Sequence, residues 1–214
     1  MNSRSFRVHF FTVSASLVAW FGILLQFILS LRLSIANGNG ITEGVVIYFG
    51  FFTIITNIFV AFTLLLPSIS STSLLGRFFA RPGVSSAAAA SITVVGIAYF
   101  LLLRNVWDPQ GWQLIADIVL HYVTPILFLI YWWFAVPKET LKWSSIPIWT
   151  LYPIGYAGYA FVRGAITGLY PYHFIDVCAL GYLSAFTNAS MILFGFVLTA
   201  AILVAVAKLK NPKS

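Results

Sequence analysis

Residues 112–136 read WQLIADIVLHYVTPILFLIYWWFAV and form an apolar stretch in which Asp117 is the single Asp, Glu, Lys or Arg residue. A helix that crosses the ~30 Å hydrocarbon core of a bilayer needs ~20 such residues, because a helix satisfies its own backbone hydrogen bonds where water is absent. The stretch therefore predicts a membrane-spanning helix. It also carries two ionisable side chains, Asp117 and His121, and such groups are rare inside a membrane.

Five more stretches have the same character, and turn-forming residues separate all six. With the stretch at 112–136, they predict an all-α polytopic membrane protein, one bundle of six transmembrane helices in a single domain over residues 1–214. The first stretch follows Arg4 and Arg7 but is longer than the apolar part of a cleavable signal, so we expect it to stay as an anchor. The other five stretches are residues 8–33, 45–66, 84–103, 145–162 and 183–207.

The composition supports this fold class and excludes others. Of the 214 residues, 60% are hydrophobic and 8% are charged, whereas about a quarter of the residues in soluble domains are charged. The net charge of +7 is interpreted as a sign of membrane orientation, and no nucleic-acid partner is expected. Cys178 is the one cysteine, which excludes an intramolecular disulfide and CxxC redox chemistry.

The basic residues predict the orientation of the helices. When alternate connections are assigned to opposite sides, nine basic residues fall on one side and three on the other. Because basic residues accumulate on the cytoplasmic side, both termini are expected in the cytoplasm. The nine are Arg4, Arg7, Arg77, Arg81, Lys138, Lys142, Lys208, Lys210 and Lys213, and the three are Arg32, Arg104 and Arg163.

Polar residues of the predicted helices gather in the half of the membrane away from the termini. This distribution predicts a pocket that opens outward, because intramembrane polar groups usually face a protein interior or a wet cavity. The alternative is that several of them contact lipid headgroups. The residues are Gln26, Thr53, Thr56, Asn57, Arg104, Asp117, His121, Arg163, Thr187 and Asn188.

Two of these helices carry residues that could act together. Thr53 lies nine residues after Gly44 and His121 lies nine after Trp112, so a helical rise of ~1.5 Å per residue puts both ~13 Å below the outer boundary. Asp117 precedes His121 by one helical turn and could orient its imidazole. The three residues could supply an orienting carboxylate, a base and a hydroxyl nucleophile.

Each of these side chains also has a structural interpretation. A threonine in a membrane helix commonly donates its hydroxyl to the carbonyl one turn earlier. His121 could make a plain interhelical hydrogen bond, and Asp117 could be a solvated carboxylate near the membrane surface.

Residues 163–176 read RGAITGLYPYHFID and are too aromatic for an ordinary solvated loop. Tyr170, Tyr172 and Phe174 suit the headgroup layer, so we interpret the segment as an interfacial lid. An ordinary aromatic belt is the alternative. His173 is interpreted as a water-facing loop histidine.

Three motifs resemble those of a known family, the androgen-induced and androgen-dependent membrane threonine hydrolases, which cleave fatty acid esters of hydroxy fatty acids. The resemblance runs from about residue 40 to about residue 190 and is closer to the six-helix bacterial branch. In the eukaryotic enzymes an Asp follows the Thr where this chain has Thr56 and Asn57, and their His-to-Pro spacing is one residue longer. The motifs are FFTIITN (residues 51–57), HYVTP (121–125) and TGLYPYHF (167–174).

The resemblance implies an intramembrane lipid ester hydrolase with Thr53 as nucleophile and His121 as base, in a bacterial cell membrane. The implied substrates are fatty acid esters of hydroxy fatty acids, without a cofactor or metal. An oxyanion donor is also required, and the sequence offers Asn57, Asn188 and Arg104, with Asp117 as the orienting group. Candidates for substrate binding are Arg104, Arg163, Tyr170 and Tyr172.

Other classes of protein stay open. A small-molecule or lipid transporter, or a lipid-binding membrane protein without catalysis, would also place polar residues in the outer half. The inner half, however, offers almost no polar lining, and no inverted repeat is apparent. A haem or metal protein would have His121 and His173 as its main ligands, which is a poor set. A purely structural partner is not excluded, and the oligomeric state stays open.

Overall fold

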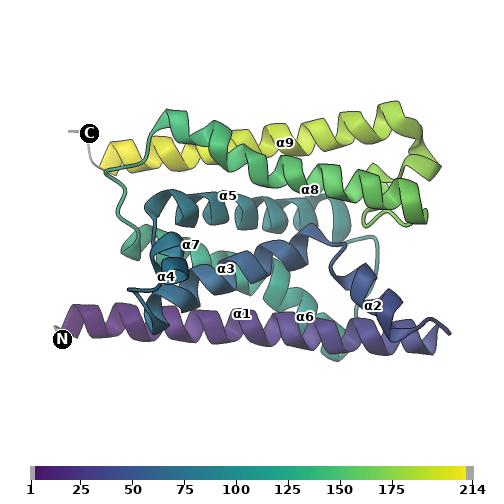
Figure 1. Ribbon diagram of the computed structural model, residues 1–214, viewed down its shortest axis with the longest axis horizontal. Coiled ribbons are helices and arrows are strands. Elements are labelled where there is room, and N and C mark those ends of the chain that lie inside the picture. The colour runs from purple at the N-terminus through teal and green to yellow at the C-terminus, as the bar shows by residue number, and fades with distance from the viewer. Residues whose placement is uncertain (1–2, 211–214) are drawn as a thin grey trace.

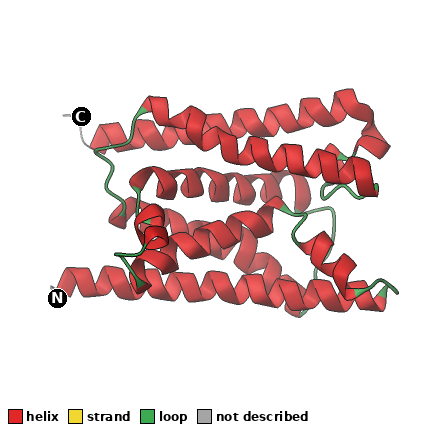
Figure 2. Cartoon of the chain, in the orientation of Figure 1, coloured by secondary structure: helices red, strands yellow, loops and turns green. Residues whose placement is uncertain are grey.

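The computed structural model describes residues 3–210, which form helices and no strand (Figure 2). The helices and the absence of strands in these residues confirm the all-helical fold class. Lys213, one of the nine basic residues expected on the inner side, lies outside the described residues. The α-helices are α1 (Ser3–Ala36), α2 (Ile41–Tyr48), α3 (Phe52–Ile69), α4 (Leu74–Phe79), α5 (Pro82–Ala98), α6 (Trp112–Ile118), α7 (Thr124–Ala135), α8 (Ile146–Thr167) and α9 (Val177–Lys210).

Five helical segments are long and apolar enough to cross a membrane, which indicates an integral membrane protein. The fifth predicted span corresponds to α8, which has 22 residues. It is long enough to cross, but its tyrosines and glycines make it less apolar than the five. The five segments are Phe6–Ala36, Phe52–Ile69, Pro82–Leu103, Trp112–Ala135 and Val177–Leu209.

The second predicted span, residues 45–66, is wrong as a single helix. Helix α2 ends at Tyr48, and α3 begins at Phe52 after Phe51 in an extended conformation. Gly50 lies at the break, where a Cβ atom would come within 2.6 Å of Nη1 of Arg163. Thr53 consequently lies in the first turn of α3, so the depth estimate that counted nine residues along one helix does not hold.

Helix α5 lies in the middle of the bundle and packs against α3, α7 and α9 (Figure 1). Its run Ala87–Ala90 is buried, because alanine side chains let neighbouring helices approach closely. Ser86 in the same helix accepts a hydrogen bond of 2.8 Å from Nε1 of Trp132 in α7.

A π-helical turn ends the third predicted span, and another interrupts the fourth. They are η1 (Tyr99–Leu103) after α5 and η2 (Val119–Val123) between α6 and α7. Pro125, just after η2, has no N–H to donate to the carbonyl of His121, which opens the regular helical pattern there. Such turns occur often at functional sites, and here the rings of Tyr99 and His121 stack with centroids 4.0 Å apart.

The start of α1 and the end of α9 lie at one end of the bundle, and α2 lies toward the other (Figure 1). Helix α8 continues to Thr167, so the predicted lid is irregular only over residues 168–176, which include the 3-10 turn η4 (His173–Ile175). We call residues 168–176 the lid segment. Gly168 begins it with φ 71°, a left-handed conformation that favours glycine at the end of a helix.

Candidate functional site

Thr53 and His121 lie together, as the sequence predicted, although they come from different helices. The hydroxyl oxygen Oγ1 of Thr53 is 3.4 Å from Nε2 of His121. Thr53 is in the first turn of α3 and His121 is in the π turn η2. Both side chains are mostly buried, with exposed fractions of 8% and 13%. The pair therefore meets inside the bundle, away from bulk water.

The hydroxyl of Thr53 does not follow the usual pattern of membrane threonines. Seven other helical threonines donate to the carbonyl four residues earlier. For Thr53 that carbonyl belongs to Phe49, outside α3, and its hydroxyl faces His121 instead. The break before α3 thus leaves this hydroxyl available for chemistry. The seven are Thr12, Thr63, Thr93, Thr150, Thr167, Thr187 and Thr199.

Asp117 holds the other side of the His121 ring. Nδ1 of His121 is 3.0 Å from the backbone oxygen of Asp117 and 3.2 Å from its Oδ1. The backbone acceptor at Nδ1, with the carboxylate charge close by, favours the tautomer with the proton on Nδ1, which leaves the lone pair of Nε2 facing Thr53. Asp117 is buried, and the hydroxyl of Tyr99 donates to its Oδ2. It is not the solvated carboxylate of the structural interpretation.

Tyr172 of the lid segment is the third group at Thr53. Its hydroxyl accepts a 3.3 Å hydrogen bond from the backbone N–H of Thr53 and lies 3.5 Å from the Thr53 Oγ1. That N–H is one of the first-turn donors that have no partner within a helix. Burial raises the pKa of the Tyr172 hydroxyl, so it stays protonated at neutral pH and its own hydrogen can be donated.

Asn57 positions the site but does not have the geometry of an oxyanion donor. Its Nδ2 donates to the backbone oxygens of Thr53 and Leu120, at 2.8 and 3.2 Å. Both amide hydrogens are therefore committed to carbonyl groups. The side chain connects α3 to η2 and thereby fixes the helix that carries Thr53 against the turn that carries His121.

Four other predicted residues lie away from Thr53, so their expected roles as oxyanion donors or substrate contacts find no support in the geometry. The Arg104 guanidinium is exposed and stacks 3.8 Å from the centroid of the Phe100 ring. Arg163 is buried rather than at the rim, and its Nη1 donates to the backbone oxygen of Leu169.

The remaining two of the four, like Arg163, make contacts that hold the lid segment in place. Asn188 donates to the backbone oxygen of Phe174 at 2.8 Å. The ring of Tyr170 packs so closely on Gly164 that a Cβ there would lie 2.2 Å from it. Arg163, Asn188 and Tyr170 thus hold the lid segment against α8 and α9, and only Tyr172 of the predicted binding residues reaches the site.

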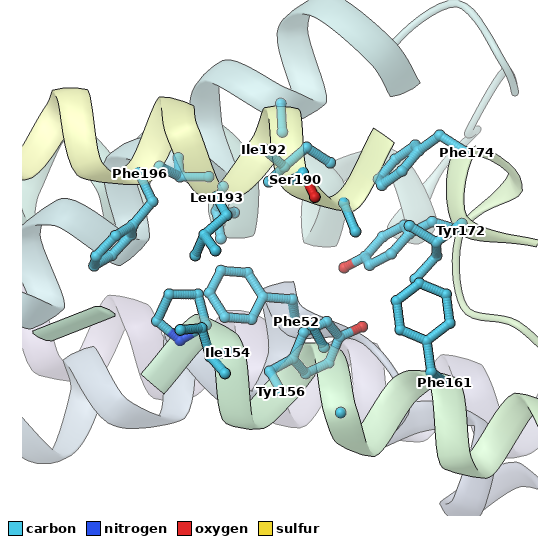
Figure 3. Close-up of a pocket in the computed structure, with 18 of the residues that line it drawn as sticks. Phe52, Ile154, Tyr156, Phe161, Tyr172, Phe174, Ser190, Ile192, Leu193 and Phe196 are labelled. Atoms are coloured by element: carbon cyan, nitrogen blue, oxygen red, sulfur yellow. The ribbon is translucent and has the colours of Figure 1, made fainter. Parts of the chain in front are cut away.

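Two cavities adjoin the site. The α8–α9 cavity, of about 460 Å³, is lined by apolar side chains such as Val94, Leu193 and Phe196. Figure 3 shows it with Leu193 and Phe196 on one side, Phe52 and Ile154 on the other, and the Tyr172 hydroxyl pointing into the space between them. Residues that line it include Phe52, Thr53, Tyr99, Leu103, Ile154, Tyr156, Ala157, Val162, Tyr172 and Phe186.

The α1–α6 cavity, of about 390 Å³, is the more polar of the two. Gln113 donates to Gln26 at 2.7 Å, and Gln26 donates to Ser30 at 3.1 Å. His121 and Asp117 line this cavity, whereas neither lines the α8–α9 cavity.

Sequence reasoning missed Tyr99 and the role of the Tyr172 hydroxyl. The chain has 10 tyrosines, and nothing in their spacing separates these two from tyrosines of the membrane interface. The Tyr99–Asp117 hydrogen bond joins the π turn η1 to α6, and the sequence does not reveal that π turn. Within residues 3–210, no group of three or more His, Cys, Asp or Glu side chains could hold a metal ion.

Comparison of the chain with protein-family models, with curated proteins and with solved structures finds no match.

Proposed function

We propose that this chain is an intramembrane lipid ester hydrolase in which Thr53 is the nucleophile and His121 the base. The observation that carries the proposal is the 3.4 Å approach of the Thr53 Oγ1 to Nε2 of His121, beside two cavities. A threonine hydroxyl is a weak nucleophile unless a base adjoins it, and a base needs an orienting partner. Asp117 supplies that partner.

The reaction has two steps. Thr53 Oγ1 attacks the ester carbonyl while its proton passes to Nε2 of His121. The tetrahedral intermediate then expels the alkoxide, which takes that proton and leaves as the alcohol. Water then gives a proton to Nε2 of His121 and attacks the acyl–threonine ester. The Thr53 oxygen leaves, takes that proton back to become a hydroxyl again, and the carboxylic acid is released.

The negative charge of the intermediate needs hydrogen-bond donors, and the lid segment brings one to Thr53. The Tyr172 hydroxyl accepts the backbone N–H of Thr53, which leaves the hydrogen of the tyrosine to donate to an oxyanion. The N-terminus of α3 adds the positive end of a helix dipole at the same point. The Tyr172 hydroxyl takes the role that the sequence assigned to Asn57, Asn188 or Arg104.

The same proposal includes the membrane arrangement and the family. We take α8 as a sixth span beside the five apolar helices, with both termini in the cytoplasm and the lid segment outside, in a bacterial cell membrane. The shared end of α1 and α9 (Figure 1) agrees with an even number of crossings. Thr53, His121 and Tyr172 belong to the motifs that resemble the threonine hydrolases, so fatty acid esters of hydroxy fatty acids are the first substrates to assay.

The test is hydrolysis of such esters by the purified protein and three variants. We expect Thr53→Ala to abolish activity and His121→Ala to lower kcat by about 10²–10⁴-fold, which is the usual contribution of a general base. A fluorophosphonate probe should label the wild type and not Thr53→Ala.

Thr56→Ala is the matched control. Thr56 lies one turn after Thr53, but its hydroxyl contacts Tyr152 at 3.1 Å, so its loss should leave kcat unchanged. Equal activity in wild type, Thr53→Ala and His121→Ala would exclude the catalytic proposal. Lipid binding without hydrolysis would then favour the transporter or lipid-binding alternative.

A further inference from the structure

We propose that the two cavities are separate subsites: the α8–α9 cavity holds the acyl chain of the ester and the α1–α6 cavity holds its alcohol. This inference rests on the proposed function. Its starting point is that both cavities share one boundary, formed by Thr53, Tyr99, Leu103 and Tyr172. The nucleophile therefore stands where the two cavities meet, and an ester carbonyl at Thr53 would extend one arm into each.

The position of the base decides which arm enters which cavity. The proton that His121 takes from Thr53 must be given to the leaving oxygen, so the alcohol lies on the side of the imidazole. His121 lines the α1–α6 cavity and not the α8–α9 cavity. The alcohol consequently occupies the α1–α6 cavity, and the acyl chain occupies the other.

The chemistry of the two linings agrees with this assignment. Leu193, Phe196 and Val94 give the α8–α9 cavity a hydrocarbon wall, suited to an apolar chain. In the α1–α6 cavity, the side-chain amides of Gln26 and Gln113 can hydrogen-bond a polar group on the alcohol. With volumes of about 460 and 390 Å³, each cavity can take a sizeable group, so the preferred ester has two large arms.

The mouths of the cavities also differ. Ile154, Val162 and Phe186 of the α8–α9 cavity are 47%, 62% and 50% exposed and lie on the two helices that would face lipid, so an acyl chain can enter sideways from the bilayer. Val106 and Trp107 of the α1–α6 cavity are 58% and 45% exposed and lie in the connection between η1 and α6. The alcohol product can leave there toward the membrane surface.

The test uses one narrowing variant in each cavity. Ala157→Phe fills part of the α8–α9 cavity, and Ser30→Phe fills part of the α1–α6 cavity. Ala165→Phe, at an exposed position of α8 that lines neither cavity, is the control. Hydrolysis is measured on two ester series, one with a fixed alcohol and acyl chains of increasing length, the other with a fixed acyl chain and alcohols of increasing length.

We expect Ala157→Phe to lower kcat/KM for the longest acyl chains by at least about tenfold relative to short ones, and to leave the alcohol series unchanged. Ser30→Phe should do the reverse, since one methylene too many in a filled pocket is commonly worth tenfold or more. If both variants affect the same series, or the two effects are exchanged, the subsite assignment is overturned.

A binding measurement separates this inference from the proposed function. Ether analogues with the same two arms cannot be hydrolysed, and their binding is followed as a rise in Tm. Wild-type Tm should rise as either arm lengthens, and each narrowing variant should lose that response to one arm. If no ester is hydrolysed but the ethers show this pattern, only the proposed function fails. If esters are hydrolysed and neither measurement distinguishes the arms, only the subsite inference fails.

Discussion

At the scale of single residues, the break between α2 and α3 determines what Thr53 can do. The sequence predicted that Thr53 and His121 would meet, from polar residues at similar depth and from a family resemblance. It could not predict the first-turn position of Thr53, because the continuous apolar run over residues 45–66 looks like one helix. The hydroxyl is available because Phe49, four residues earlier, lies outside α3. The chain breaks there, next to Gly50, which packs against Arg163.

The residue Asp117 carries the first prediction. Asp117→Asn keeps the size of the side chain and the backbone acceptor for Nδ1 of His121, but removes the negative charge 3.2 Å from Nδ1. We expect kcat for ester hydrolysis to fall by about 10²–10⁴-fold with little change in KM, because the imidazolium that forms when His121 takes the Thr53 proton loses the carboxylate that stabilises it. An unchanged kcat in a folded Asp117→Asn protein would show that the carboxylate charge does not assist the base.

Tyr172 allows a test of the oxyanion donor. Tyr172→Phe keeps the ring that stacks on Phe174 and removes the hydroxyl at Thr53. Loss of one such donor commonly lowers kcat by about 10²–10³-fold, and we expect that loss with KM nearly unchanged. Tyr152→Phe is the matched control, because its hydroxyl contacts Thr56 and its removal should affect stability alone. Equal loss of kcat in both variants would contradict the assignment.

At the scale of elements, the two π turns carry Tyr99 and His121, and Asp117 in the last turn of α6 completes the cluster. The sequence predicted the helices that contain them and the local effect of Pro125, but periodicity does not reveal a single extra residue in a helical turn. That is why the contact between α5 and η2 escaped prediction. Gly96 of α5 lies at this contact, where a Cβ would be 3.3 Å from the backbone oxygen of His121.

This contact predicts the effect of enlarging Gly96. Gly96→Leu must push α5 away from η2, and overpacking of this kind costs about 1–3 kcal/mol, so both Tm and kcat should fall. Gly195→Leu is the control, because a Cβ at Gly195 meets nothing within 4 Å. Thermal unfolding in detergent measures the first effect and ester hydrolysis the second. A Gly96→Leu protein with wild-type Tm would mean that α5 does not pack on the turn as described.

At the scale of the whole molecule, composition and apolar runs predicted the all-helical class and five of the long apolar helices. The termini of those helices were less predictable. Helices α1 and α8 run beyond the expected spans, and α9 begins before its expected span, with a non-helical Gly181 inside it. Hydropathy detects the part of a helix that lies in hydrocarbon, whereas polar and aromatic turns at the ends are set by packing, which a one-dimensional profile does not contain.

Cys178 makes the proposed orientation testable, because its thiol can be labelled in the wild-type protein. It is the one cysteine of the chain and is exposed at the start of α9. The excess of basic residues on the side of the termini predicts that this end of α9 is external. A membrane-impermeant maleimide added to intact cells should therefore label the wild type. Ser71→Cys, made in a Cys178→Ser background, places the thiol at an exposed position between α3 and α4 and should react only after the membrane is opened.

The opposite pattern would invert the orientation and put the lid segment, and with it the mouth of the α1–α6 cavity, on the cytoplasmic side. Labelling at both positions in intact cells would be incompatible with an odd number of crossings between residues 71 and 178, and therefore with α8 as a membrane span.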